Sequence, residues 1–255
     1  MSALSEHEPH VAYVLRLADS NLVLAQRLGE WVGHAPALEE DLALANIALD
    51  LLGQARLLLT HAGVLEGKGR DEDALAFLRE EREFLNVALV EQPNGDFGDT
   101  IARQFLHDAW QVELYGRLAA SRDAQLAAIA TKALRESTYH LRFSAGWMVR
   151  LGDGTDESHR RVEESLGRLW PCTLELCEAD DLDRAMLALG IGVDLAAVRA
   201  GWDRRVNDTL TEATLTRPAD RPWRWFGKRG VHGEHLGRLL AEMQSLHRAH
   251  PGAQW

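Results

Sequence analysis

Long stretches of the chain repeat apolar residues at the spacing of an amphipathic helix, whereas the alternating pattern of a β-strand is scarce. Leu, Ala, Glu and Arg dominate these stretches, and all four are good helix formers. The seven prolines fall near breaks in the pattern, and Pro171 is expected to kink or divide the helix in which it lies. We therefore predict an all-α protein with helices near residues 9–33, 38–62, 71–86, 98–120, 123–151, 155–178, 180–189, 194–213 and 232–248.

The order of these helices predicts two helical hairpins, 9–62 and 98–151, joined by a long crossover through 63–97. One long crossover between two hairpins is how ferritin-like bundles are connected. The segment from Leu42 to Leu59 is apolar almost all round, which is typical of a central, buried helix. We therefore expect a ferritin-like four-helix bundle with additional peripheral helices.

A single domain spanning 1–255 is expected from this layout. Its bundle core covers about 9–151, and peripheral helices with a C-terminal arm cover about 152–255. The chain has 255 residues, of which 46% are apolar, so it is long enough to bury one large core or two small ones.

Four polar residues interrupt the apolar stripes of the expected bundle: Asn21, Asp50, Asp108 and Glu136. A buried, unpaired carboxylate is costly, so such groups are paired, protonated or bound to a metal. The two residues of each hairpin lie at matching levels, since 29 residues separate Asn21 from Asp50 and 28 separate Asp108 from Glu136. Matched polar residues on two hairpins resemble the di-iron carboxylate bundle, where two helices each supply a Glu and the other two each supply a Glu-x-x-His motif.

The metal-binding motif itself is broken. Gly53 occupies the histidine position of the motif in the second helix, and Tyr139 occupies it in the fourth helix. His140 follows one residue after that position. The first helix supplies neutral Asn21 in place of a carboxylate, so too few ligands remain for two irons. We predict a degenerate site whose polar residues form a buried network of hydrogen bonds and ion pairs. Nearby residues that are expected to complete this network are Gln54, Gln104 or Arg103.

Several strings of the sequence resemble the family of the C component of phenylacetyl-CoA epoxidase. The likeness runs from about residue 10 to residue 248, and the longest strings are the most specific. They are Ala43–Arg56 (ALANIALDLLGQAR), Pro93–Phe97 (PNGDF), Ile101–Trp110 (IARQFLHDAW), Tyr139–Arg142 (YHLR), Leu151–Thr155 (LGDGT) and Leu240–Gln244 (LAEMQ).

The resemblance implies a ferritin-like fold and a role in aerobic phenylacetate degradation. In that system a different polypeptide, the catalytic A component, carries the di-iron centre and epoxidises the ring of phenylacetyl-CoA. The C component resembles a degenerate, non-catalytic sister of the catalytic component that binds and supports it, and a reductase and further small subunits complete the assembly. The resemblance therefore implies that this chain has no catalytic residue, no metal and no cofactor, and that the iron lies in the partner. It also leaves homodimerisation within a hetero-oligomer as an option.

A basic, aromatic arm follows the helix predicted over 194–213 and runs from Arg217 to Arg229 (RPADRPWRWFGKR). It is rich in basic and aromatic residues although the protein is acidic, and this composition is favoured at interface hot spots. We predict that it docks on a partner, with two alternatives: contact with coenzyme A phosphates, and packing on its own bundle. The residues of the predicted docking arm are Arg217, Arg221, Trp223, Arg224, Trp225 and Phe226.

Two further histidine positions have alternative interpretations. His232 and His235 begin the last helix, where they are expected to make a helix entry or interface contact, and the alternative is a metal site. His107 precedes Asp108 on its helix and is expected at the surface or satisfied in the core. The two cysteines, Cys172 and Cys177, match no zinc pattern and are expected to be reduced.

The net charge of −11 argues against a nucleic-acid partner, because phosphates favour basic surfaces. No signal peptide is visible, and no stretch approaches the ~20 apolar residues of a membrane span, so a cytoplasmic protein without a membrane partner is expected. Two other functions stay open: a metal-dependent oxygenase or oxidase with an atypical carboxylate site that uses His140, and a binding module for coenzyme A esters.

Overall fold

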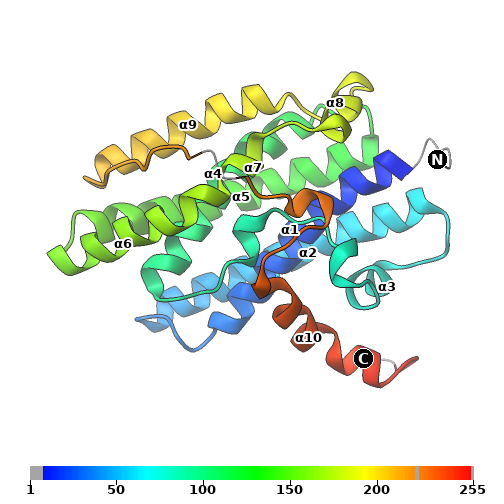
Figure 1. The fold of residues 1–255 in the computed structure, drawn as a ribbon, viewed down its shortest axis with the longest axis horizontal. Helices are drawn as coiled ribbons and strands as arrows, with labels where there is room; N and C mark the ends of the chain where they lie inside the picture. The colour runs from blue at the N-terminus through cyan, green and yellow to red at the C-terminus, as the bar shows by residue number, and fades with distance from the viewer. Residues whose placement is uncertain (1–7, 222–223, 254–255) are drawn as a thin grey trace. The chain divides into compact units, whose positions relative to one another are not determined.

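The structure is a computed structural model that describes residues 8–221 and 224–253 (Figure 1). Within these residues the regular structure is helical, and β-type pairing is limited to an isolated bridge between Phe226 and Val231. The predicted all-α class is therefore confirmed. The α-helices are α1 (Glu8–Trp31), α2 (Leu38–Glu66), α3 (Glu72–Phe77), α4 (Phe97–Leu118), α5 (Ala124–Gly152), α6 (Asp156–Leu169), α7 (Leu174–Cys177), α8 (Asp181–Ala188), α9 (Leu195–Glu212) and α10 (Glu234–Ala249). Short 3₁₀ helices are η1 (Glu81–Glu83), η2 (Ala88–Glu91), η3 (Trp170–Cys172) and η4 (Gly227–Arg229).

Two of the predicted helices are interrupted. The sixth is divided at Pro171, as expected, because α6 ends at Leu169 and η3 and α7 follow. The third, predicted over 71–86, is too long: α3 ends at Phe77. Beyond it, the carbonyl of Leu75 accepts a hydrogen bond from the Arg79 side chain at 2.5 Å, so a side chain satisfies an acceptor at the end of this helix.

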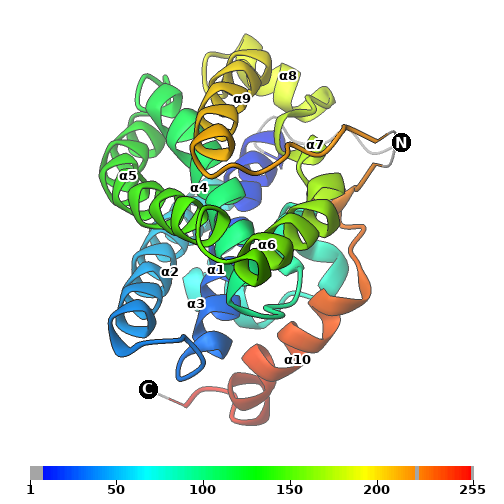
Figure 2. The ribbon, with the colours of Figure 1, turned by 90° about the vertical axis from the view of Figure 1, so that its left-hand side faces the viewer.

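Contacts within the chain divide it into two compact units, and the first comprises 1–93 and 226–255. In this unit α1 and α2 lie side by side along their length (Figures 1 and 2). The segment after α3 is fastened to α1 by the buried Asp19, which pairs with Arg79 and accepts from the Leu85 N–H at 2.8 Å. The C-terminal segment approaches so closely that a Cβ at Gly230 would lie 2.3 Å from the Arg82 carbonyl oxygen.

Helix α2 is not the buried central helix that its composition predicts. Its inward face is buried, but the opposite face exposes large apolar side chains to solvent. Leu49, for example, is 65% exposed. The prediction was wrong because a sequence that is apolar all round does not determine which face of the helix is buried. Within the described residues, only one face of α2 is covered by another element. The exposed apolar residues of α2 are Leu38, Leu42, Leu49, Leu52, Leu57 and Val64.

The second unit comprises 94–225, and its α4 is the helix that is buried almost all round. The turn before α4 uses Gly95 at a positive φ of 60°, and a capping box between Asp96 and Asp99 starts the helix. Helices α5, α6 and α9 pack against α4. The indole N–H of Trp202 on α9 donates to the Leu106 carbonyl of α4 at 3.0 Å. The prediction of one domain spanning 1–255 stays a prediction.

Candidate functional site

In the first unit, the polar residues at the centre of the α1–α2 hairpin are two amides. Asn21 on α1 and Gln54 on α2 are each 1% exposed, and the Asn21 Nδ2 donates to the Gln54 Oε1 at 3.2 Å. Gln54 therefore occupies the inward position that the sequence pattern assigned to Asp50. Asp50 and Gly53 are only half-buried. The core placement of Asp50 was wrong because on a fully apolar helix the pattern does not tell which polar residue points inward.

In the second unit, Asp108 lies in the core as predicted. Its carboxyl is fully buried and accepts hydrogen bonds from Gln104 Nε2 and Ser144 Oγ, each at 2.7 Å. Burial raises the pKa of Asp108 well above its ordinary value, although the two hydrogen bonds act in the opposite direction. The environment therefore favours the neutral acid. Gln104, one of the residues predicted to complete the buried network, contacts it.

The α4–α5 hairpin brings together a second neutral pair, Gln111 and Ser137. Both are buried, and the Ser137 Oγ donates to the Gln111 Oε1 at 2.9 Å. Glu136, which was predicted in the core, is half-buried and forms an ion pair with Lys132 on the same helix at 2.8 Å. Its placement was wrong by one residue of helical phase: Ser137 faces inward, and Tyr139 is 57% exposed.

His140 is buried and lies three residues after Ser137, so Ser137-x-x-His140 has the spacing of the Glu-x-x-His motif with serine in the glutamate position. On α2 the corresponding pair is Gln54 and Leu57. The sequence pattern missed this register because it was anchored on Glu136, the nearest carboxylate. The signal that could have found it was the intact i, i+3 spacing from a small polar residue to His140.

His107 on α4 is fully buried in the same unit. Neither of its ring nitrogens has a hydrogen-bond partner in the described part of the chain. Burial lowers the pKa of His107 to about 3, and the nearby His140 and Arg103 act in the same direction. His107 is therefore a neutral imidazole at physiological pH. Arg103, also fully buried, donates to the Asn94 Oδ1 at 2.6 Å.

These residues do not fit a di-iron centre. The inward polar pairs of the two hairpins are neutral, Asn21 with Gln54 and Gln111 with Ser137, and Asp108 is a buried carboxyl on α4. Two iron ions need carboxylates to neutralise their charge, and neutral amides and a hydroxyl do not supply that charge. The degenerate site stays a prediction: Asn21, Asp108 and His140 are buried, and Gln54 and Ser137 face inward in place of Asp50 and Glu136.

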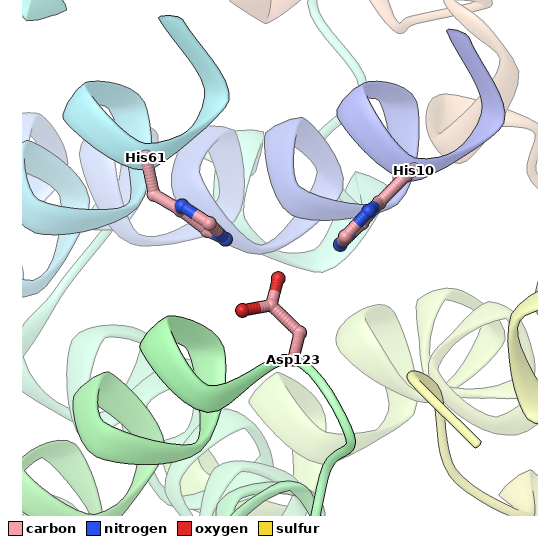
Figure 3. A group of neighbouring side chains, drawn as sticks. All are labelled: His10, His61 and Asp123. Atoms are coloured by element: carbon pink, nitrogen blue, oxygen red, sulfur yellow. The ribbon is translucent and has the colours of Figure 1, made fainter. Parts of the chain in front are cut away.

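Two other histidines, which the sequence pattern did not single out, meet in the first unit (Figure 3). His10 of α1 and His61 of α2 point toward one another, with ring centroids 6.1 Å apart in an edge-to-face arrangement. Asp123, in the second unit, caps α5 by accepting from the Leu126 N–H at 3.0 Å.

His232 was weighed as a metal ligand or a helix-entry contact, and the structure supports the contact. Its ring is buried, with Nδ1 3.0 Å from the Glu91 carboxylate and Nε2 2.8 Å from the Phe84 carbonyl oxygen. Burial by itself lowers the pKa of His232, but the bonds to Glu91 and Phe84 raise it above its ordinary value. Both ring nitrogens are engaged, so the metal alternative is wrong for this residue.

The basic arm is partly packed on its own unit. Arg217 donates to Asp203 and Asn207, each at 2.6 Å, and its guanidinium lies over the Trp170 ring. Arg224 pairs with Glu178, and Trp225 is half-buried. Arg221 and Phe226 are exposed, and Trp223 lies outside the described residues. Packing therefore accounts for part of the arm, and docking stays a prediction.

The α2 sequence requires one more correction. By length and composition, α2 is apolar enough to cross a membrane, contrary to the expectation that no stretch approaches this limit. Its most apolar 18-residue window is 44% buried, and the core helix of a soluble protein passes the same test. Neither cysteine forms a disulfide among the described residues: Cys172 is buried and Cys177 is half-buried.

Comparisons with known proteins show the family of this chain. A family model described as "Phenylacetic acid catabolic protein" matches residues 2–255. A relative from Escherichia coli (strain K12), which bears the name of the C component of 1,2-phenylacetyl-CoA epoxidase, is 58% identical over 244 residues. The match covers 96% of this chain and 98% of the relative, so the two proteins correspond over nearly their full lengths.

Proposed function

The chain belongs to the phenylacetic acid catabolic protein family, whose fold is ferritin-like, and from this membership we propose that it is a structural subunit of a phenylacetyl-CoA epoxidase. In this role it has no catalytic residue and no metal of its own. It supports a homologous catalytic subunit, the A component, which holds the iron and oxidises the substrate. A reductase and further small subunits complete the proposed complex in the cytoplasm.

One observation carries the proposal: the inward polar pairs of the two hairpins are neutral residues that bond to one another. Asn21 with Gln54, and Gln111 with Ser137, form hydrogen bonds within their own hairpins. A chain that keeps the scaffold of an oxygenase but has too few core carboxylates for two irons is suited to support chemistry and unsuited to perform it.

The exposed apolar face of α2 supports the partner part of the proposal. The face runs from Leu38 to Val64, 26 residues apart, which is about 39 Å of helix at about 1.5 Å per residue. Contiguous exposed apolar surface of this kind marks interaction sites in soluble proteins. Burying it on the catalytic subunit would contribute about 25 cal/mol per Å² of apolar area before the cost of association.

Co-purification with the catalytic subunit tests the docking face. A Leu42→Glu/Leu49→Glu double variant places two carboxylates in the proposed interface, where each unpaired charge costs roughly 3 kcal/mol, or about a hundredfold in Kd. We expect co-elution on size exclusion to be lost. The matched control is Leu246→Glu, which changes an equally exposed leucine on α10 and should leave co-elution intact.

Two outcomes would contradict the proposal. Retained co-elution of the α2 double variant would exclude this face, and the same assay on Trp225→Ala and Phe226→Ala would then test the arm. Iron quantification on the separated subunits tests the non-catalytic role: we expect iron on the catalytic subunit and none on this chain. One equivalent of iron bound to this chain would favour the alternative of an oxygenase in its own right.

A further inference from the structure

A pocket in the second unit has no role in the proposed scaffold. It encloses about 380 Å³, which lies within the range of about 300–1,000 Å³ for small-molecule sites. Three arginines line it, together with one acid and two apolar or weakly polar side chains. The lining residues are Leu174, Cys177, Glu178, Arg199, Arg221 and Arg224.

Arg199 of α9 is held in place from three sides. Its Nε donates to Asp203 at 2.9 Å, its Nη2 donates to Asp220 at 3.0 Å, and its guanidinium lies 5.1 Å from the centre of the Trp202 ring. Its Nη1 has no partner among the residues that the structure describes. The side chain is therefore oriented before any ligand arrives, and it keeps a donor group for one.

The other two arginines come from the basic arm. Arg221 is exposed and forms no ion pair with any described residue. Arg224 pairs with Glu178 through its Nη1. The described lining residues carry three guanidinium groups and one carboxylate, and Asp203 and Asp220 beside them pair with Arg199. Arg221, which has no ion-pair partner among the described residues, and the open Nη1 of Arg199 are therefore the groups that can bind an anion.

We propose that this pocket binds an organic phosphate. Guanidinium groups match the oxygens of a phosphate with paired hydrogen bonds, and Arg221 and Arg199 supply unused donors for them. Leu174 and Cys177 provide an apolar wall for the rest of the ligand. A coenzyme A thioester and a free nucleotide both carry this chemistry, and the experiment below separates these two sources.

Glu178 acts as an internal competitor for the ligand. Its carboxylate already occupies Arg224, so a phosphate must either displace it or bind beside it. Removing the charge of Glu178 frees one arginine and removes a like-charge repulsion with the ligand. The site therefore predicts two changes of opposite sign: loss of Arg221 weakens binding, and neutralisation of Glu178 strengthens it.

Calorimetric titration of the whole chain tests the site with four probes: coenzyme A, adenosine 3′,5′-bisphosphate, inorganic phosphate and adenosine. We expect the bisphosphate and coenzyme A to bind, and adenosine not to bind. Arg221→Ala should raise the Kd at least tenfold, and Glu178→Gln should lower it severalfold. Arg184→Ala removes an exposed arginine of α8 outside the pocket and should change nothing. Tighter binding of coenzyme A than of the bisphosphate would identify a coenzyme A ester as the source, and equal binding would identify a nucleotide.

Three results would overturn the inference: no binding of either organic phosphate at millimolar concentration, an unchanged Kd for Arg221→Ala, or inorganic phosphate binding as tightly as the bisphosphate. The measurements use the isolated chain and need no partner. Failure here therefore leaves the proposed scaffold role untouched, and failure of co-purification leaves the phosphate site untouched.

Discussion

At the residue scale, the buried carboxyl group of Asp108 shows how neutral neighbours can satisfy a polar group in the core of this protein. Its two oxygens are within 2.7 Å of Gln104 and Ser144, both neutral. The Ser144 hydroxyl also lies 3.4 Å from the Leu141 carbonyl oxygen, to which it can donate instead. A neutral acid or an amide therefore satisfies the same neighbours.

Replacing this group should be tolerated, and the effect should depend on pH. Because burial raises the pKa of Asp108 in the folded state, its contribution to stability is fully present below the unfolded pKa of about 3.9 and is lost as pH rises through the folded pKa. We expect Asp108→Asn to match the wild-type free energy of unfolding near pH 4 and to equal or exceed it at pH 7.

Urea unfolding at the two pH values measures this difference. Asp208→Asn, on the exposed side of α9, is the control and should show no such trend. A loss of about 2 kcal/mol or more for Asp108→Asn at pH 7 would mean that the core needs the ionised carboxylate, as a metal site does.

The buried pair of His232 and Glu91 makes the attachment of the C-terminal segment depend on pH. The pKa of His232 is raised in the folded state, so its stabilisation is fully present below the unfolded pKa of about 6.5 and is lost as pH rises through the folded pKa. Glu91→Gln leaves the buried imidazolium without its charged partner and should cost roughly 3 kcal/mol at pH 6.

Unfolding of Glu91→Gln and wild type should therefore converge as the pH is raised, because the histidine becomes neutral in both. The control is His250→Gln, which changes an exposed histidine after α10. An equal loss for Glu91→Gln at every pH would assign the pair a packing role that does not depend on the charge of His232.

Residues also show the limit of sequence patterns. The presence of matched polar groups on the hairpins and the core position of Asn21, Asp108 and His140 could be predicted. The choice of Gln54 over Asp50, and of Ser137 over Glu136, could not. Charged residues draw attention in a sequence, but burial selects against charge, so the inward groups are the neutral ones nearby.

At the element scale, the burial expected of α2 is found in α4 instead. Helix α2 is the more apolar and leaves one face exposed, whereas α4 is buried almost all round and carries polar residues such as Arg103, Gln104 and Asp108. Composition predicts how much a helix gains from being covered, but it does not say whether the cover lies in the same chain. We propose that another subunit covers the exposed leucines of α2.

Helix positions, in contrast, could be predicted because they depend on local signals. The turn at Gly95 and the break at Pro171 are where backbone chemistry places them. The arm after α9 could be predicted only in part. Its charge and aromatic content follow from the sequence, but the partners of Arg217 within its own unit depend on the folded structure. Internal pairing of arginines cannot be distinguished from docking by composition alone.

At the scale of the whole molecule, the distribution of polarity is that of a subunit. Neutral amides and the Asp108 carboxyl, whose pKa is raised by burial, lie in the interior, while an apolar helix face remains outside. Family membership gives the ferritin-like fold and the association with an epoxidase.

A chain with this role should gain stability from its partner. A partner that binds only the folded state adds RT ln(1 + [L]/Kd), which is about 2.7 kcal/mol at a hundredfold excess over Kd. For a chain of this length, each kcal/mol corresponds to about 2–4 °C, so the catalytic subunit should raise the melting temperature of this chain by roughly 5–10 °C. Differential scanning calorimetry of the mixture and of the separate proteins measures the shift. The shift should disappear with Leu42→Glu/Leu49→Glu and persist with Leu246→Glu. If the mixture melts as the sum of its two components, the exposed face of α2 does not meet the catalytic subunit, and the scaffold role would have to rest on another surface.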